Sequence, residues 1–321
     1  MVDFASAKAD AASLNHYLIL TMSLTTDLDI AAIVHALGAN ACHFDVDLID
    51  LCESTNSLLL ARAETGVASG SVIVAQHQTA GRGRRGRAWI SAPGDSLTFS
   101  LLWRLPPHVQ VSGLSLAAGL AVVRAMDELL SVGADETSAK PETTMLQGGR
   151  AKDALCAVAC DDTPSLMPTQ LKWPNDIIVD GRKLGGILVE LIPGATPGSN
   201  VAVIGCGINL RLPSTMPADL HVQSAALNLG ATVNPNTVLA AILVALLNVL
   251  EQFTRGGFAA LQTDWMQRDA FANQPVRVLS EFAPPINGIC RGVNADGALR
   301  LEVDGSIQVL LSGEVSLRLA P

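Results

Sequence analysis

The chain has 321 residues, a formal net charge of −9 and a hydrophobic fraction of 49%. This length provides material for one large domain or two, each with a core, and a charged fraction of 16% excludes a disordered protein. With a pI of about 5.1, the chain also lacks the basic surface of a general nucleic-acid binder.

Six scattered cysteines form no pattern typical of a zinc site, and their sparse use fits a reducing compartment. The apolar run 238–247 is too short to cross a bilayer. The N-terminus has no basic segment or cleavage site typical of a signal peptide. We therefore expect a cytoplasmic protein that does not enter a membrane, with residues 1–25 as an N-terminal extension.

The spacing of apolar residues predicts helices and strands in the first part of the chain. In chain order these are a helix over 27–37 that stops at Gly38, a strand over 44–48, a helix over 54–61, strands over 71–75 and 96–103, and a helix over 113–130 closed by Gly133. Ser54 or Thr55 would cap the second helix. Residues 134–168 lack periodicity and are expected to form a surface insertion.

The second part of the chain begins with short strands and ends with more of them. The expected elements are strands over 170–173, 177–179, 184–191 and 201–204, helices over 237–253 and 258–269, and five strands within 276–317. Asp180-Gly181 is typical of a hairpin turn. The expected organisation is an α+β body over residues 26–271 and a small β-barrel over residues 272–321.

The segment Gly81–Arg87, called the arginine loop below, places four arginines and three glycines between two expected strands. Arginine matches phosphate and carboxylate oxygens, and glycine lets the backbone approach a ligand closely. A cationic loop on an acidic protein favours a specific anion as its ligand. A solvated basic loop or a nucleic-acid patch is the alternative interpretation.

Further polar clusters lie near expected strand ends or tight turns: 54–56, Gln78, 172–176, 183–186 and 205–209. Lys183 and Asp176 flank a hairpin and are expected to face each other. Gly185-Gly186 in a strand indicates either close packing or a β-bulge. Together, the neutral groups and the cations of these clusters suit a ligand with an uncharged polar head, an apolar arm and a carboxylate to be activated by a nucleotide.

In this order the clusters resemble the motifs of the biotin–protein ligases, also called biotin–acetyl-CoA-carboxylase ligases. The matching segments are Glu53–Asn56, Gln78–Trp89, Lys172–Asp176, Gly181–Glu190 and Gly205–Asn209. Each segment is a weak signal alone, but the ordered set is specific, and the resemblance spans about residues 27–321.

The resemblance implies an α+β fold: a mixed sheet with helices on one face, related to class II aminoacyl-tRNA synthetases, followed by an SH3-like barrel. It also implies formation of biotinyl-5′-adenylate from biotin and ATP with Mg²⁺, then transfer of biotin to a lysine of a biotin carboxyl carrier protein or domain. No residue is assigned to a protein-bound metal.

The resemblance carries three sets of residues onto this sequence. The expected biotin-binding residues are Ser54, Thr55, Asn56, Gln78, Arg82, Gly83, Arg84, Lys172 and Gly186. The expected nucleotide-binding residues are Arg84, Arg87, Trp89, Asn175, Lys183, Gly207 and Asn209. The expected catalytic residues are Arg84, Lys172, Asp176 and Lys183, with Asp176 orienting or deprotonating the incoming lysine.

Bifunctional members of the family carry a winged helix-turn-helix before the catalytic part. Here residues 1–53 hold one expected helix and a single lysine with no arginine, so we expect a monofunctional enzyme that does not bind DNA. A lipoate–protein ligase-like acyl transferase is the nearest competing hypothesis, but Gln78 beside the arginine loop favours biotin. A nucleic-acid-binding regulator and an inactive biotin sensor are two more distant hypotheses.

Overall fold

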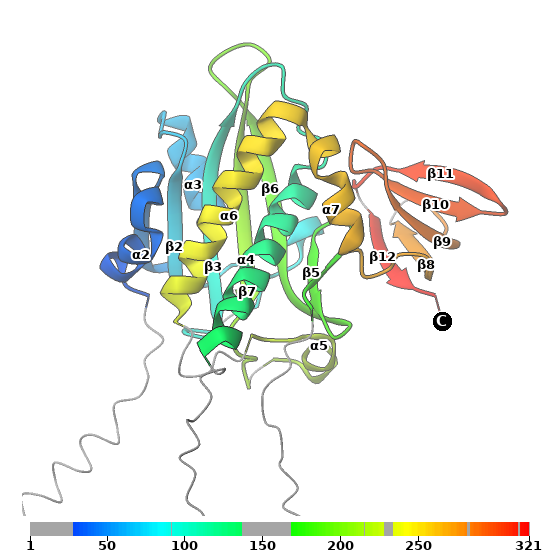
Figure 1. Ribbon diagram of the computed structural model, residues 1–321, viewed down its shortest axis with the longest axis horizontal. Coiled ribbons are helices and arrows are strands. Elements are labelled where there is room, and N and C mark those ends of the chain that lie inside the picture. The colour runs from blue at the N-terminus through cyan, green and yellow to red at the C-terminus, as the bar shows by residue number, and fades with distance from the viewer. Residues whose placement is uncertain are drawn as a thin grey trace, which may run out of the picture.

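The computed structural model describes residues 28–90, 92–136, 168–214, 216–227, 234–280, 283–313 and 315–320. Its main sheet has seven strands in the order β1-β2-β3-β7-β6-β5-β4 (Figure 1). These strands are β1 (Asp45–Cys52), β2 (Ser71–Gln78), β3 (Ser96–Leu105), β4 (Gln170–Lys172), β5 (Asp176–Val179), β6 (Arg182–Pro193) and β7 (Asn200–Asn209). β1 and β2 run parallel and the other neighbours antiparallel, so the sheet is mixed.

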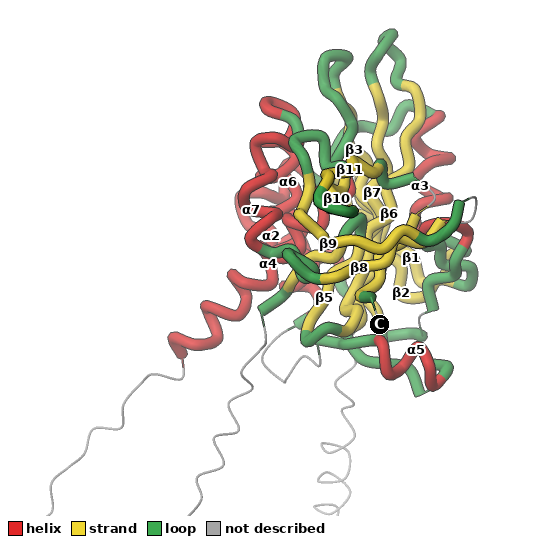
Figure 2. Tube along the Cα trace, turned by 90° about the vertical axis from the view of Figure 1, so that its right-hand side faces the viewer, coloured by secondary structure: helices red, strands yellow, loops and turns green. Residues whose placement is uncertain are grey.

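Helices α2 (Ile30–Leu37), α4 (Leu114–Glu136) and α6 (Pro235–Gly256) cover one face of the sheet, whereas α3 (Thr55–Glu64) lies on the other (Figure 2). The alternation along the strands supplies both faces. Val72 and Val74 join the large core under α4 and α6, while Ile73 packs with Leu59 of α3 in a separate cluster. The main helix layer thus lies on one face, as expected. The helix α3 differs from that expectation, because it covers the opposite face.

The helix ends follow the expected capping chemistry, with one exception. Ser54 caps α3 by accepting from Ser57 N–H, and α2 stops at Gly38, whose φ is 55°. The expectation that Gly133 closes α4 was wrong, because the helix continues through it to Glu136. An interior glycine costs a helix only about 1 kcal/mol relative to alanine, so it need not end one.

Three further expectations differ from the structure. The helix expected over 258–269 is a 3-10 turn, η3 (Phe258–Leu261), followed by the short α7 (Gln262–Gln267). The glycines of 205–209 lie inside β7 rather than after it, because the strand reaches Asn209. Three short elements were not expected, namely η1 (Gly38–His43), η2 (Arg84–Gly86) and α5 (Ala218–Gln223). The expected extension over residues 1–25 and most of the expected insertion, residues 137–167, fall outside the described residues.

The five expected C-terminal strands are confirmed as one antiparallel sheet in the order β11-β10-β9-β8-β12. They are β8 (Pro275–Ser280), β9 (Ile286–Val293), β10 (Leu299–Val303), β11 (Ser306–Leu310) and β12 (Val315–Leu319). The turn before β10 packs on the main body. A Cβ at Gly297 would lie 2.8 Å from Gly113 Cα, and the indole N–H of Trp173 donates to Gly297 O (3.1 Å).

By length and composition, α6 is the one helix among the described residues that could cross a membrane. In the fold it packs against α4 and α2, and its apolar side chains form much of the large core. Burial of this kind stabilises the fold by roughly 1.5–3 kcal/mol for each large aliphatic side chain.

Candidate functional site

A cavity of about 660 Å³ opens beside the main sheet, between the arginine loop, the β4–β6 strands and the C-terminal sheet. It brings together all of the expected biotin-binding, nucleotide-binding and catalytic residues. These are Ser54, Thr55, Asn56, Gln78, Arg82, Gly83, Arg84, Arg87, Trp89, Lys172, Asn175, Asp176, Lys183, Gly186, Gly207 and Asn209.

One end of the cavity is uncharged, and Thr55 and Gln78 form it. The backbone N–H of Thr55 donates to Gln78 Oε1 (2.8 Å), and Thr55 Oγ1 lies 3.2 Å from the same oxygen. Both residues are buried. Because the side chain of Gln78 presents its oxygen to Thr55, its amide nitrogen is left as a donor. This end therefore offers directed hydrogen-bonding groups without a net charge.

Asn56 lies behind this end, and its side chain is already bonded within the protein. Its Nδ2 donates to Glu190 Oε2 (2.9 Å) and Leu188 O (3.3 Å). Its Oδ1 lies 2.6 Å from Ser100 Oγ. A Cβ at Gly205 would lie 2.2 Å from that amide oxygen, so β7 needs glycine there to admit the Asn56 side chain.

The arginine loop is held over the cavity by contacts to the main sheet and to the C-terminal sheet. Arg82 forms an ion pair with Glu190 (2.8 Å). Arg84 donates to Asn175 Oδ1 (3.4 Å), to Gly313 O (2.7 Å) and to Ser312 O. The last two contacts join the loop to the turn before β12 of the C-terminal sheet.

Trp89 follows the loop and lies against β7. A Cβ at Gly207 would lie 2.7 Å from the indole ring, so a side chain at this position would displace it. The indole N–H is buried and has no hydrogen-bond partner among the described residues. This arrangement leaves a flat aromatic surface in the wall of the cavity.

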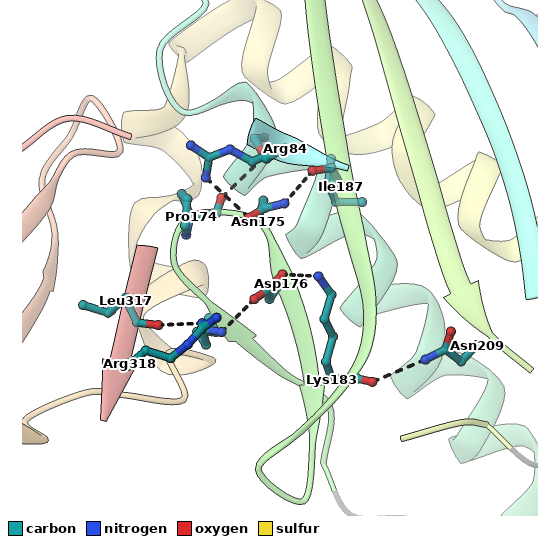
Figure 3. Close-up of polar contacts among 11 residues, drawn as sticks. Arg84, Pro174, Asn175, Asp176, Lys183, Ile187, Asn209, Leu317 and Arg318 are labelled. Atoms are coloured by element: carbon teal, nitrogen blue, oxygen red, sulfur yellow. Dashed lines mark hydrogen bonds and ion pairs between the residues drawn. The ribbon is translucent and has the colours of Figure 1, made fainter. Parts of the chain in front are cut away.

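The charged end of the cavity is built on the β4–β5–β6 hairpins. Asp176 accepts from Lys172 Nζ (2.7 Å) through one carboxylate oxygen and from Lys183 Nζ (2.6 Å) through the other. The expectation that Lys183 and Asp176 face each other is therefore confirmed, and Figure 3 shows the Lys183 side chain pointing towards Asp176.

Local irregularity of the strands makes this pairing possible. Ile177 pairs with Gly185 but Ile178 pairs with Lys183, so Leu184 is an extra residue in a β-bulge. Gly186 lies opposite Asp176, and a Cβ there would be 3.3 Å from Lys183 Nζ. Both interpretations of Gly185-Gly186 are thus correct, since the strand has a bulge and also needs space for a side chain.

Burial and charge act in opposite directions on these groups. Burial alone would raise the pKa of Asp176, but the ammonium groups of Lys183 and Lys172 lower it to about 2. Burial lowers the pKa of Lys172, although Asp176 opposes this change. Lys183 is 40% exposed, whereas the Lys172 side chain is 11% exposed and lies 6.0 Å above the Phe271 ring.

The structure adds several residues that the sequence reasoning missed. Arg318 of β12 lines the cavity, and its charge contributes to lowering the pKa of Lys172. Glu190 belongs to the matching segment Gly181–Glu190 but had no expected role, and the structure shows it bound to both Asn56 and Arg82. Met216, Leu220 and Val222, from the segment around α5, form an apolar wall. A lone charged residue near the end of a sequence carries no signal of where the second sheet docks.

Comparison with known proteins shows what this arrangement is similar to. Residues 48–209 match the model of the biotin/lipoate A/B protein ligase family, and residues 271–318 match the biotin protein ligase C-terminal domain. The chain is 34% identical to the bifunctional ligase/repressor BirA of Escherichia coli, over 86% of this chain and 74% of that protein.

Two further relatives extend the similarity. The chain is 31% identical to the biotin–acetyl-CoA-carboxylase ligase of Mycobacterium tuberculosis, over 87% of this chain and 91% of that protein. The biotin protein ligase from Aquifex aeolicus, solved in complex with biotin and ATP, superposes with a TM-score of 0.65. The two are 25% identical, over 86% of this chain and 99% of the other.

Proposed function

Because this chain belongs to the biotin/lipoate A/B protein ligase family, we propose that it activates biotin with ATP to biotinyl-5′-AMP and transfers biotin to a lysine of a carboxylase biotin-carrier domain. The observation that carries the proposal is the polarity of the cavity. Its neutral end suits the ureido head of biotin, and its cationic end suits a carboxylate meeting a phosphate. The expected setting of the reaction is the cytoplasm.

At the neutral end, Ser54, Thr55 and Gln78 would hold the biotin head. Asn56 is better assigned to positioning than to ligand contact, because its amide bonds to Glu190, Leu188 and Ser100. This assignment refines the expectation that Asn56 binds biotin directly.

At the charged end, the cations would stabilise negative charge as the biotin carboxylate attacks the α-phosphate of ATP. Lys172 would meet the carboxylate and the α-phosphate, and Lys183 would serve the leaving phosphates, since both lysines line the cavity. Preorganised cations of this kind contribute about 3–4 kcal/mol each to the transition state. Arg84 would close the arginine loop over the mixed anhydride and exclude water, and Gly83 would let the loop backbone approach it.

On the nucleotide side, Trp89 and Gly207 present the aromatic wall, and Arg87 adds a cation to the loop. Asn209 would act by positioning its neighbours. Its amide donates to Ala225 O (2.9 Å) and so fixes the segment that follows α5 against the end of β7. Asn175 joins the hairpin to Arg84.

Asp176 would act in the second half-reaction. While both lysines are paired with it, a carboxylate with a pKa of about 2 is too weak a base to take a proton at neutral pH. Once phosphates draw the lysines away, its negative charge becomes available to attract and orient the incoming lysine ammonium. Orientation is therefore the role that the charge arrangement supports best.

Magnesium would enter with ATP. Among the described residues no cluster of three metal-ligating side chains occurs, and Asp176 and Glu190 are both engaged with cations. Mg²⁺ commonly keeps several waters and binds through substrate phosphates with one or two carboxylates at most. The donor set thus fits a metal carried by the triphosphate, where it would neutralise phosphate charge.

The lipoate hypothesis is weaker, because a dithiolane ring has no N–H or C=O to match Thr55 and Gln78, and because residues 271–318 match a biotin ligase domain. The deciding experiment measures pyrophosphate release with ATP and Mg²⁺, using biotin in one arm and lipoate in the other, followed by mass spectrometry of an added carrier domain. Release with lipoate but none with biotin would reverse the assignment.

A further inference from the structure

Ser100 lies behind the neutral end of the cavity and is fully buried, at 0% exposure. Its hydroxyl oxygen lies 2.8 Å from Thr55 Oγ1 and 2.6 Å from Asn56 Oδ1. Both contacts have hydrogen-bond lengths, but Ser100 carries a single proton. The direction of each bond therefore has to follow from the neighbouring groups.

Two amide orientations are fixed by backbone groups. Asn56 must direct its nitrogen to Leu188 O and Glu190, since both are acceptors, so its oxygen faces Ser100. Gln78 must direct its oxygen to Thr55, since the backbone N–H of Thr55 needs an acceptor. Reversing either amide would place two donors or two acceptors against each other.

The proton positions follow. An amide oxygen can only accept, so Ser100 donates to Asn56. The contact between Ser100 and Thr55 must then use the proton of Thr55. The remaining contact, Thr55 Oγ1 to Gln78 Oε1, holds no proton, which agrees with its being the longest of the three at 3.2 Å.

We infer that Ser100 is a positioning residue that fixes Thr55 Oγ1 as an acceptor for a ligand N–H, beside the amide donor of Gln78. Ser100 does not line the cavity, so it acts through Thr55. The inference rests on the proposed function, because the ureido ring of biotin offers both an N–H and a C=O. A donor and an acceptor set side by side select such a ring over one that lacks either group.

Calorimetric binding without ATP tests the inference, using biotin and two cyclic carbamate analogues, each with one ureido N–H replaced by oxygen. Wild-type protein should bind one analogue at least about tenfold more weakly than biotin, since Thr55 would face an oxygen with no proton between them. In Ser100→Ala the Thr55 hydroxyl is free to turn and donate to the ligand. The preference, meaning the ratio of affinities for biotin and that analogue, should therefore shrink by about tenfold.

Ser96→Ala is the matched control, because Ser96 is a buried serine of the same strand whose hydroxyl has no partner among the described residues. It should keep the wild-type preference. Ser100→Cys replaces the hydroxyl by a larger and weaker donor without removing the donor, and should give an intermediate preference even if Ser100→Ala folds poorly.

The outcomes are separable. Equal loss of affinity for all three ligands in Ser100→Ala, with the preference kept, would make Ser100 a structural support and overturn the inference. Equal wild-type binding of biotin and both carbamates would also overturn it. Wild-type protein that binds none of them would instead contradict the proposed function.

Discussion

Replacing Asp176 by asparagine removes the charge at the centre of the lysine pair without changing the shape of the side chain. In the wild-type protein the carboxylate bonds to Lys172 and Lys183, and the Asp176 side chain is only 14% exposed. In Asp176→Asn the two ammonium groups would face a neutral amide and repel each other. The free energy of unfolding should therefore fall, by an amount that depends on pH.

The magnitude follows from the pKa of Asp176. Its fall from 3.8 to about 2 corresponds to roughly 2.5 kcal/mol of stability at neutral pH. This value lies just below the range of about 3–5 kcal/mol for breaking a buried ion pair, as expected when Lys183 is 40% exposed.

The sign follows from the direction of the pKa change. A lowered carboxylate pKa stabilises the fold above its ordinary value of 3.8, and that contribution disappears as the pH falls towards 2. The difference between wild type and Asp176→Asn should therefore be largest at pH 7 and should close under acid, where wild-type Asp176 is itself neutral.

Urea unfolding between about pH 3 and pH 7 measures this difference, which should be about halved by pH 3 and should close only nearer pH 2. Asp180→Asn is the matched control, since Asp180 lies on the same hairpin, is 59% exposed, and has a φ of 50° that asparagine tolerates. It should change stability by less than about 0.5 kcal/mol at every pH. A deficit in Asp176→Asn that stays constant across the pH range would refute the electrostatic reasoning.

Four other substitutions test single parts of the site. Gly207→Ala should displace Trp89, whose ring would lie 2.7 Å from the new methyl, so the KM for ATP should rise, tryptophan fluorescence should change, and biotin affinity should be kept. Arg84→Gly should release biotinyl-adenylate faster and label bystander lysines, which mass spectrometry of an added inert protein would detect; unchanged release would contradict its covering role. Lys172→Ala and Lys183→Ala should each slow adenylation by roughly 10²–10³ in single-turnover assays. Calorimetry should show weaker biotin binding for Lys172→Ala alone; equal loss in both would make the two lysines common supports of one hairpin.

Much of the fold was predictable because local chemistry and tertiary structure agree in most of this chain. Ser54 caps α3 as its residue type suggests, and Asp180-Gly181 turns the β5–β6 hairpin with both residues at positive φ. The apolar alternation in β3 gives a strand that is buried almost throughout. Gly133 is one exception, because helix propensity is a weak preference that neighbouring turns can override.

Some residues of the site could be predicted from the sequence and others could not. Motif residues could be found because each combines an unusual residue type with a nearby strand end or turn. Ser100 could not be, since a single serine in an apolar strand becomes informative only when Asn56 and Thr55 are seen to contact it. Arg318 comes from the second sheet, and its effect on the pKa of Lys172 depends on how the two sheets dock.

That docking makes the C-terminal sheet part of the site. The guanidinium of Arg84 is held by carbonyls of the turn before β12, and the buried indole N–H of Trp173 donates to Gly297 O. Without that sheet the indole N–H of Trp173 would lose its acceptor, and Arg84 would lose its hydrogen bonds to Ser312 O and Gly313 O. Trp173 precedes the hairpin that carries Asp176, so loosening it would disturb the charged end of the cavity. The main sheet supplies most of the lining residues, but the geometry of the charged end depends on both sheets.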